Sequence, residues 1–341
     1  VSSADAAEDD WSVRAAETVL REFPAEERSW GYETGVLLKA IRHVWERTDD
    51  PRYLDYVREA MDHLIAPDGT IRGYRREDYN LDKINSGKVL LLLRDETNDP
   101  RYAAAVDRLM EQIHEQPRNG EGGFWHKKRY PHQMWLDGIY MAAPFYAQFA
   151  RQYFEPAALD DAIHQIVVIE EHTREPRTGL LYHAWDESRK QRWANPETGC
   201  SPHFWGRAVG WYAMAVLDVL DRVPKDHPQR DRLITIFRAT VDAIVRVQDP
   251  VSGVWYQVLD QGGEPGNYLE SSASCMFVYA IAKGVRMGYL GEEYLAVARR
   301  AYEGILAQFI KVDEQGLVNI DGICAVAGLG GKPYRDGSYQ Y

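Results

Sequence analysis

The sequence has no long apolar run, few cysteines and a deficit of basic residues. No stretch of its 341 residues approaches the ~20 consecutive apolar residues that span a membrane. Lys and Arg number 40 against 52 Asp and Glu, which gives a formal net charge of -12. Because binding to nucleic acid or to an anionic membrane relies on a basic surface, we expect neither as a partner. A small anionic substrate is compatible with this net negative charge, since one or two buried cations can bind it.

The cysteines and the first ten residues give information about the cellular compartment of the protein. Cys200, Cys275 and Cys324 are an odd number of cysteines and lie far apart in the sequence. This pattern indicates reduced thiols in a reducing compartment, and we therefore expect a cytoplasmic protein. Residues 1–10 are acidic and lack an initiator methionine and a basic-plus-apolar signal sequence, so we expect a disordered or trimmed segment there.

A repeated helical unit organises the chain. Residues 46–64 are echoed by residues 95–113, and each copy contains the pattern Thr-x-Asp-Pro-Arg-Tyr. Asp is a favoured N-cap and Pro is favoured at the first helical position, so the pattern predicts a tight turn between two helices. A repeat of nearly 50 residues is typical of an array of helical hairpins.

Two kinds of helix alternate along the chain. Helices that are apolar around most of their circumference are predicted to be buried, and amphipathic helices are predicted to lie outside them. This alternation predicts a closed toroid of roughly six hairpins, with an open helical superhelix as the alternative. No linker or composition shift divides the chain, so we expect one domain over residues 1–341. The expected inner helices cover residues 31–45, 81–93, 136–150, 206–220 and 270–287, and the expected outer helices cover residues 11–23, 51–65, 101–113, 159–171, 231–247 and 292–309.

Two long connections, residues 116–135 and 175–205, are rich in Trp, His, Arg and Lys. Loops of this length within a compact domain are usually functional. In an alternating toroid all inner helices start at one rim, so the residues of their first turns converge there. Two carboxylates, an arginine and indole rings fit a site for an acidic sugar, because rings stack on sugars, Arg binds carboxylates and acids transfer protons. The converging residues are Asp82, Trp135, Asp137, Trp205, Arg207, Ser271 and Ser272.

Each of these residues also has a structural interpretation. An aspartate in the first turn of a helix is most often an N-cap or a partner of the helix dipole. Arg207 could form a structural ion pair, and Trp205 and Trp211 could be core residues. The functional interpretation is favoured because several such residues fall at one predicted rim, beside both long loops.

Four segments carry a resemblance to a known family. Residues 79–91, 122–150, 180–188 and 204–220 resemble the unsaturated rhamnogalacturonyl hydrolases of glycoside hydrolase family 105, and the Trp-Leu-Asp-Gly block at residues 135–138 is the most specific match. The similarity covers the chain from about residue 30 to the end. It implies an all-α (α/α)6 barrel that removes a terminal Δ4,5-unsaturated uronic acid from oligosaccharides made by a polysaccharide lyase. We expect no cofactor and no metal.

The same resemblance assigns roles to individual residues. It implies that Asp137 is the general acid and base and that Asp82 is the second acidic residue of the site. Contacts with the substrate are implied for His126, Lys127, Trp135, His183, Trp205, Arg207 and Trp211.

The unsaturated uronide suggests a mechanism, since its C4=C5 bond is a vinyl ether. Asp137 would protonate C4 and then deprotonate a water that adds at C5, after which the hemiketal opens and the leaving sugar is released. This requires a protonated Asp137 near neutral pH. We expect Asp82 and burial to raise the pKa of Asp137 by more than the helix N-terminus lowers it, so that the two acids titrate as a pair.

Other functions remain open at this point. The chain could be an unsaturated glucuronyl hydrolase that acts on ulvan or glycosaminoglycan products, a sugar epimerase, or a carbohydrate-binding toroid without activity. A zinc site is a further alternative, built from Cys200, His203, Cys275 and Cys324. The sequence leaves the leaving sugar and the oligomeric state open.

Overall fold

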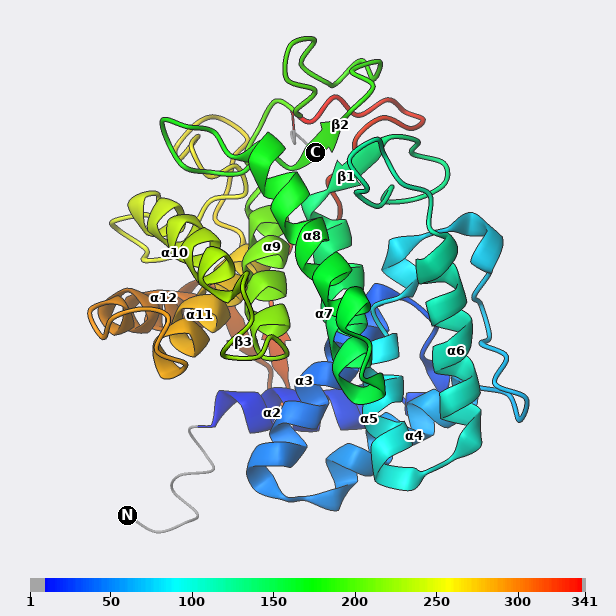
Figure 1. The fold of residues 1–341 in the computed structure, drawn as a ribbon. Helices are drawn as coiled ribbons and strands as arrows, with labels where there is room; N and C mark the ends of the chain where they lie inside the picture. The colour runs from blue at the N-terminus through cyan, green and yellow to red at the C-terminus, as the bar shows by residue number, and fades with distance from the viewer. Residues whose placement is uncertain (1–9, 339–341) are drawn as a thin grey trace. The chain divides into compact units, whose positions relative to one another are not determined.

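The computed structural model describes residues 10–338, which contain eleven α-helices and four short strands. The expected N-terminal segment, residues 1–10, therefore lies outside the described residues except for Asp10. The chain divides into two compact units, Val1–Glu115 with Lys311–Asn319 and Gln116–Ile310 with Ile320–Tyr341. The expectation of one domain stays a prediction. Figure 1 follows the helices in chain order from blue to red.

The first unit consists of paired helices joined by short turns. Helix α3 packs against α4, and α5 packs against α6, as the hairpin pattern predicts. Its helices are α2 (Trp11–Glu22), α3 (Tyr32–Thr48), α4 (Pro51–Leu64), α5 (Gly87–Thr97) and α6 (Pro100–Glu115), with 3-10 helices at Ala25–Glu27, Arg76–Asp78 and Leu81–Lys83.

The repeated Thr-x-Asp-Pro-Arg-Tyr turn forms as predicted. The carboxylate of Asp50 accepts a hydrogen bond from the backbone N–H of Arg52 at 3.0 Å, and that of Asp99 accepts one from Arg101 at 2.9 Å. A proline opens the helix that follows in both copies. Each turn therefore satisfies one of the N–H groups that a helix start leaves without a partner.

The tyrosine of this pattern links each outer helix to the one before it. The hydroxyl of Tyr53 on α4 donates to Glu17 on α2 at 2.7 Å, and that of Tyr102 on α6 donates to Asp62 on α4 at 2.7 Å. Both tyrosines are buried. The repeat in the sequence thus encodes a polar contact between neighbouring hairpins as well as a turn.

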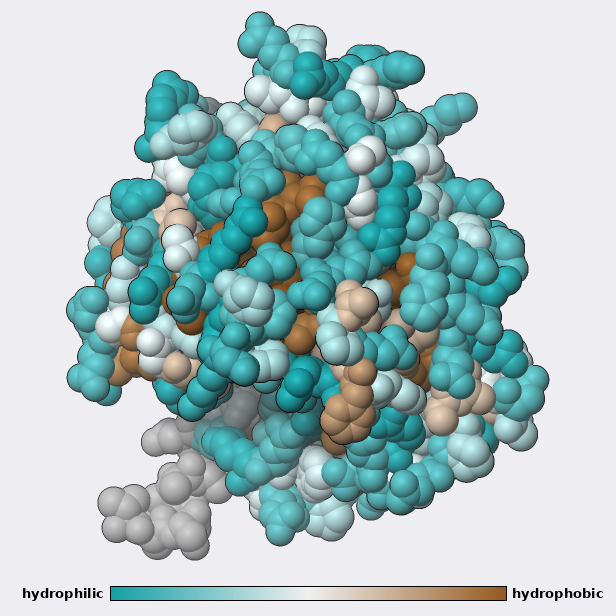
Figure 2. All heavy atoms as spheres, in the orientation of Figure 1, coloured by the Kyte–Doolittle hydropathy of each residue, from teal (hydrophilic) through white to brown (hydrophobic). Residues whose placement is uncertain are grey.

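The second unit places three inner helices side by side. Helix α9 packs between α7 and α11, while α8, α10 and α12 pack on these three (Figure 1). Nearly every residue of α7 and α9 is buried, as expected for helices that are apolar all round. Hydrophilic side chains dominate the surface view, with apolar residues visible only in patches between them (Figure 2). The bounds are α7 (Leu136–Tyr153), α8 (Pro156–Thr173), α9 (Gly206–Leu220), α10 (Arg230–Arg246), α11 (Ser271–Arg286) and α12 (Tyr294–Gln308).

One predicted inner helix begins later than expected. The pattern predicts a helix over residues 81–93, but α5 begins at Gly87, and Asp82 lies in the preceding 3-10 turn. The side chain of Asn80 accepts the backbone N–H of Asp82 at 3.1 Å and caps this turn. Asn, Ser and Gly at positions 85–87 are poor helix formers, which separates the turn from the helix. Asp82 is therefore not in the first turn of an inner helix.

The two long connections contain a small ribbon. Strand β1 (Gln133–Trp135) pairs antiparallel with β2 (Ala184–Asp186), and a second ribbon joins β3 (Ile310–Val312) to β4 (Val318–Ile320). No helix within residues 10–338 has the length and apolar character of a membrane span.

Candidate active site

The β1–β2 ribbon positions the start of α7. Trp135 pairs with Ala184 in its register, and the backbone N–H of Leu136 donates to the carbonyl of His183 at 3.0 Å. Asp137 follows in the first turn of α7. The two long loops therefore meet, as the sequence predicts, and they bring His183 to the start of this helix.

Asp137 and His183 form a close pair. The Nε2 atom of His183 lies 2.9 Å from Oδ2 of Asp137. The His183 side chain is fully buried and that of Asp137 is 15% exposed, so the carboxyl keeps limited access to the outside. A partly exposed carboxyl held by an imidazole is suited to general acid and base chemistry.

The pKa of Asp137 moves in the opposite direction to the one expected from the sequence. Burial raises this pKa, but the charge of His183, its hydrogen bond and the charge of His126 outweigh burial and hold the pKa of Asp137 below its usual value. The expectation of a carboxyl protonated in the free protein is therefore wrong. Its physical reason is the imidazole partner, which the sequence did not place beside Asp137.

Two aromatic rings lie nearly parallel to the indole of Trp135, next to this pair. The His126 ring lies 4.8 Å from that of Trp135, and the Tyr130 ring lies 5.1 Å from it, both nearly parallel to the indole. Rings on opposite faces of the indole would be separated by two contacts of at least about 3.5 Å each, or about 7 Å. Since the His126 and Tyr130 rings are 6.4 Å apart, they cover the same face. Lys127 Nζ lies 5.8 Å from the Tyr130 ring.

Trp205 and Trp211 lie in different surroundings. Trp205, the residue before α9, has its ring 4.9 Å from that of His183, so it belongs to the same cluster as Asp137. Trp211 stacks on Tyr140 of α7 at 4.7 Å and is buried between the two helices. This position fits the core interpretation of Trp211, and its contact with substrate stays a prediction.

Arg207 is held by a buried polar network. Its Nε donates to the hydroxyl of Ser272 at 2.8 Å, its Nη2 donates to the carbonyl of Cys324, and the same nitrogen lies 3.6 Å from Oε1 of Glu270. The Glu270 side chain is fully buried and that of Arg207 is 9% exposed. The structural interpretation, an ion pair, thus holds for Arg207, although its ring contact with Trp205 at 5.4 Å keeps the charge beside the site.

Sequence reasoning missed Glu270. Its carboxylate caps α11 by accepting hydrogen bonds from the backbone N–H groups of Ser272 and Ala273, and it also accepts that of Cys324 at 3.0 Å. Glu is an uncommon N-cap, so no standard signal singled it out. Its position directly before the pair Ser271 and Ser272, which the sequence did select, was the available clue.

The C-terminal segment also contributes to this region. Leu329 packs in one cluster with Trp135, Ala184 and Trp193, and the carbonyl of Gly322 accepts the backbone N–H of Ser271 at 3.0 Å. Burial raises the pKa of the Cys324 thiol to about 12, with Arg207 lowering it and Glu270 raising it.

The cysteines bear on the zinc alternative. Among residues 10–338, no group of three or more His, Cys, Asp or Glu side chains is arranged to hold a metal ion. Cys200, His203, Cys275 and Cys324 therefore do not form the ligand set that this alternative requires.

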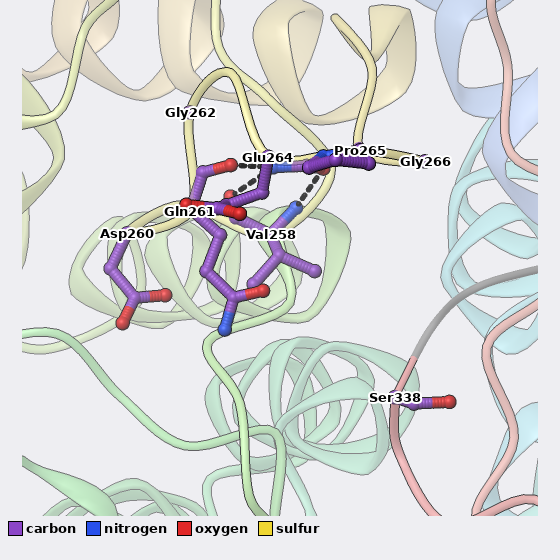
Figure 3. A pocket seen from close by; sticks show the side chains of 9 residues that line it. Val258, Asp260, Gln261, Gly262, Glu264, Pro265, Gly266 and Ser338 are labelled. Atoms are coloured by element: carbon purple, nitrogen blue, oxygen red, sulfur yellow. Dashed lines mark hydrogen bonds between the residues drawn. The ribbon is translucent and has the colours of Figure 1, made fainter.

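A cavity of about 500 Å³ lies in the second unit, at the loop between α10 and α11. Its walls are polar, and Figure 3 shows the side chains of Asp260 and Gln261 pointing to the same side of the loop. Ser338 of the C-terminal segment also lines the cavity (Figure 3). Val258, which lines the cavity, pairs with Trp205 in an isolated bridge, and this connects the cavity to the Asp137 cluster.

The predicted site residues thus fall into two groups. One group lies in the second unit near the β1–β2 ribbon and the starts of α7 and α9, and it comprises His126, Lys127, Trp135, Asp137, His183, Trp205, Arg207 and Trp211. Asp82 lies in the first unit, and the Asp82–Asp137 pair stays a prediction.

A buried carboxyl–imidazole pair beside a tryptophan stacked with His126 and Tyr130, on a scaffold of helical hairpins, is compatible with a glycosidase of the helical-barrel class. The profile described as Glycosyl Hydrolase Family 88 matches residues 4–341. A glycoside hydrolase from family 105 of C. acetobutylicum ATCC 824 superposes with a TM-score of 0.94 at 48% identity, covering 96% of this chain and 91% of that one. The chain belongs to the glycosyl hydrolases of families 88 and 105.

Two further relatives complete the comparison. The unsaturated rhamnogalacturonyl hydrolase YesR of Bacillus subtilis (strain 168) is 27% identical over 297 residues, 85% of this chain and 78% of that protein. An unsaturated glucuronyl hydrolase from Bacillus sp. GL1 shares the fold, with a TM-score of 0.65 at 14% identity over 90% of this chain and 85% of that one. The predicted fold class, an all-α (α/α)6 barrel, is confirmed by these matches.

Proposed function

We propose that Asp137, paired with His183, is the general acid and base of an unsaturated rhamnogalacturonyl hydrolase. The chain removes a terminal unsaturated uronic acid from oligosaccharides, as its family and its relatives support. The observation that carries the proposal is the 2.9 Å contact between His183 Nε2 and Asp137 Oδ2 in a cluster of buried aromatic rings. The similarity to YesR favours rhamnose as the leaving sugar.

The reaction hydrates the C4=C5 vinyl ether of the uronide. Asp137 donates a proton to C4, and positive charge develops on C5 and the ring oxygen. A water then adds to C5 while the Asp137 carboxylate takes its proton. The C5–O5 bond of the resulting hemiketal breaks to give a ketone at C5, and the hemiacetal left at C1 collapses to release the leaving sugar. One water is consumed, and Asp137 ends in the form in which it began.

The lowered pKa of Asp137 requires that the substrate itself promotes protonation. The uronide carries a C6 carboxylate, and a like charge near Asp137 raises the pKa of that residue. Binding therefore shifts Asp137 towards its protonated form in the complex.

Binding of the negatively charged uronide carboxylate requires a positively charged side chain. Arg207 is buried beside Trp205, and Lys127 lies next to the aromatic stack. Since Glu270 already neutralises much of the Arg207 charge, Lys127 is the stronger candidate for direct contact, with Arg207 supplying long-range attraction. Trp135 and Trp205 flank the sugar ring, and His126 stacks on Trp135.

A panel of Δ4,5-unsaturated disaccharides that differ only in the leaving sugar tests this function. The conjugated C4=C5 carboxylate absorbs ultraviolet light, and the hydrolase erases that absorbance while it releases a free sugar. Rhamnose as the leaving sugar should give the largest kcat/KM. Unchanged absorbance with every disaccharide would refute the proposal, and an epimerase or a binding protein would give this result.

We also propose that the enzyme acts in the cytoplasm. Cys200, Cys275 and Cys324 are free thiols, and free thiols persist in reducing compartments. Immunodetection of the native protein in fractionated cells tests this, with recovery outside the cytoplasmic fraction as the contrary result.

A further inference from the structure

We propose that the two loops at the outer end of the β1–β2 ribbon form an anion-binding rim for the sugars on the leaving side of the substrate. The rim consists of Arg129 from one loop and Arg189, Lys190 and Arg192 from the other. Its ligand is a carboxylate or a sulfate ester carried by those sugars. This inference rests on the proposed function and extends it to substrates longer or more acidic than an unsaturated disaccharide with a neutral leaving sugar.

The ribbon brings the two loops together. Gln133, the first residue of β1, is paired with Asp186, the last residue of β2, so the loop before β1 and the loop after β2 leave the ribbon at the same end. The backbone N–H of Glu187 donates to the carbonyl of His132 at 3.1 Å. Tyr130 and Ala194, one from each loop, pack against a single cluster that contains Trp135 and Trp193.

The cations of the rim are exposed and lack carboxylate partners. Arg129, Arg189, Lys190 and Arg192 are exposed, and none of them forms a salt bridge with another described residue. Many other arginines of the protein do form one, for example Arg118 with Asp161 at 2.6 Å. Positive charge is thus available here, in a protein whose net charge is -12.

The two acidic residues at the end of the ribbon, Asp186 and Glu187, are bound by the turns of the loops. Asp186 is fully buried and accepts hydrogen bonds from the backbone N–H groups of Ser188, Lys190 and Gln191. Glu187 accepts the backbone N–H of Gly120 at 2.7 Å and contacts His132 at 3.3 Å. Their oxygens are therefore occupied by the turns that hold the loops in place.

Aromatic rings, rather than carboxylates, support two of the arginines. The guanidinium carbon of Arg129 lies 4.9 Å from the Tyr130 ring, and that of Arg192 lies 4.3 Å from the ring of Tyr334. Stacking on a ring restrains a guanidinium and leaves its N–H groups in the plane free to bind a carboxylate or sulfate.

The rim lies next to the reacting groups but does not contain them. Tyr130, which Arg129 covers, stacks on Trp135, and Asp137 follows Trp135 by two residues. An anionic substrate approaching a protein of net negative charge is repelled at long range, and a local group of cations reverses the sign of the potential where it enters. The rim is therefore placed to bind anionic groups beyond the scissile bond.

The test compares three substrates on two variants. The rim variant carries Arg129→Gln, Lys190→Gln and Arg192→Gln, and the control variant carries Lys225→Gln and Arg299→Gln, which remove exposed cations elsewhere in the second unit. The substrates are the unsaturated disaccharide with neutral rhamnose, an unsaturated tetrasaccharide with a second uronate, and the disaccharide with a sulfate ester on the leaving sugar. The kcat/KM of each is measured from the loss of ultraviolet absorbance at low and at high salt.

We expect the rim variant to keep the kcat/KM of the neutral-leaving disaccharide and to lose roughly three- to tenfold on a substrate with an extra anion. Loss on the tetrasaccharide identifies a uronate as the ligand, and loss on the sulfated disaccharide identifies a sulfate. The wild type should have a higher kcat/KM for the substrate whose anion binds the rim than the rim variant has. This difference should shrink at 1 M salt, where the Debye screening length is about 3 Å. The control variant should behave as the wild type on all three substrates.

Equal kcat/KM values for wild type and rim variant on all three substrates would overturn the inference, as would an equal loss on all of them. In both cases hydrolysis of the neutral-leaving disaccharide by the wild type leaves the proposed function standing. Absence of hydrolysis of every substrate by the wild type rejects the proposed function and the inference together.

Discussion

His183 Nε2 and Asp137 Oδ2 lie 2.9 Å apart, although Asp137 is in the first turn of α7 and His183 directly precedes β2. The backbone contact from Leu136 to the His183 carbonyl holds both residues at the end of the β1–β2 ribbon. The imidazole lowers the pKa of the carboxyl despite its burial. The free protein therefore holds an ionised Asp137, and the protonation needed for catalysis depends on the substrate.

Asp137→Asn should abolish nearly all turnover while the protein folds normally. The amide cannot donate a proton to C4 or accept one from water, and a positioned acid or base contributes typically 10²- to 10⁴-fold. The ultraviolet assay measures the loss, and thermal unfolding checks the fold. Asp160→Asn, on the exposed part of α8, is the matched control and should keep full activity. Turnover above about a tenth of the wild-type rate in Asp137→Asn would exclude the acid and base role.

The pH dependence of kcat should differ from that of kcat/KM. A general acid must be protonated, so each parameter falls as the pH rises through the pKa of Asp137 in the relevant state. The free protein, in which this pKa is lowered, governs kcat/KM, and the complex, in which the substrate carboxylate raises it, governs kcat. The fall in kcat should therefore occur at higher pH than the fall in kcat/KM. Superimposable profiles would contradict substrate-promoted protonation.

Arg207→Ala should destabilise the protein as well as raise KM. It leaves the fully buried Glu270 carboxylate without its cation, and breaking a buried pair in this way costs about 3 to 5 kcal/mol. Urea denaturation measures the free energy of unfolding. Adding Glu270→Gln to Arg207→Ala removes the unpaired charge and should recover part of the loss. A loss below about 1 kcal/mol for Arg207→Ala would show that the ion pair is unimportant for stability.

Asp50→Ala and Asp99→Ala should each lower the free energy of unfolding by about 1 kcal/mol, since each removes an N-cap. Activity should be unchanged. Asp49→Gly is the control, because Asp49 has a positive φ of 56° that glycine adopts without strain, and it should be nearly neutral. Equal effects of all three substitutions would contradict the capping assignment.

Lys283 should make stability depend on alkaline pH. Burial lowers the pKa of Lys283, but Asp218 at 2.8 Å and Asp221 at 2.6 Å raise it above its usual value. The stabilisation by the charged lysine is complete below the unfolded pKa of about 10.4 and is lost as the pH rises through the folded pKa. Lys283→Met should therefore be destabilised at pH 7, and its deficit relative to wild type should shrink as the pH rises above that folded pKa. A deficit that is independent of pH would contradict this reading.

The helices were predictable from the sequence because their signals are local. Apolar residues around most of the circumference marked α7 and α9, and the Asp-Pro turn marked the starts of α4 and α6. The prediction for residues 81–93 was wrong at its start because Asn80 and the Asn-Ser-Gly run favour a 3-10 turn followed by a new helix. The same local signals placed Asp137 in the first turn of α7, where the structure has it.

Side-chain partners were not predictable in this way. The sequence selected Asp137, His183 and Arg207 by their residue types and by resemblance, but it could not state that His183 contacts Asp137 or that Glu270 holds Arg207. These contacts join residues from separate loops and helices. They follow from the pairing of β1 with β2 and from the packing of α9 against α11.

The sequence by itself determined the alternation of buried and amphipathic helices, the turns between them and the set of residues able to perform chemistry. Only the tertiary structure decided the charge state of Asp137, the partner of Arg207 and the grouping of the basic loops. The reason is physical. Helix propensity and capping act within a few residues, whereas the pKa of a carboxyl depends on the burial and charges around it, and those are set by segments far away in the chain.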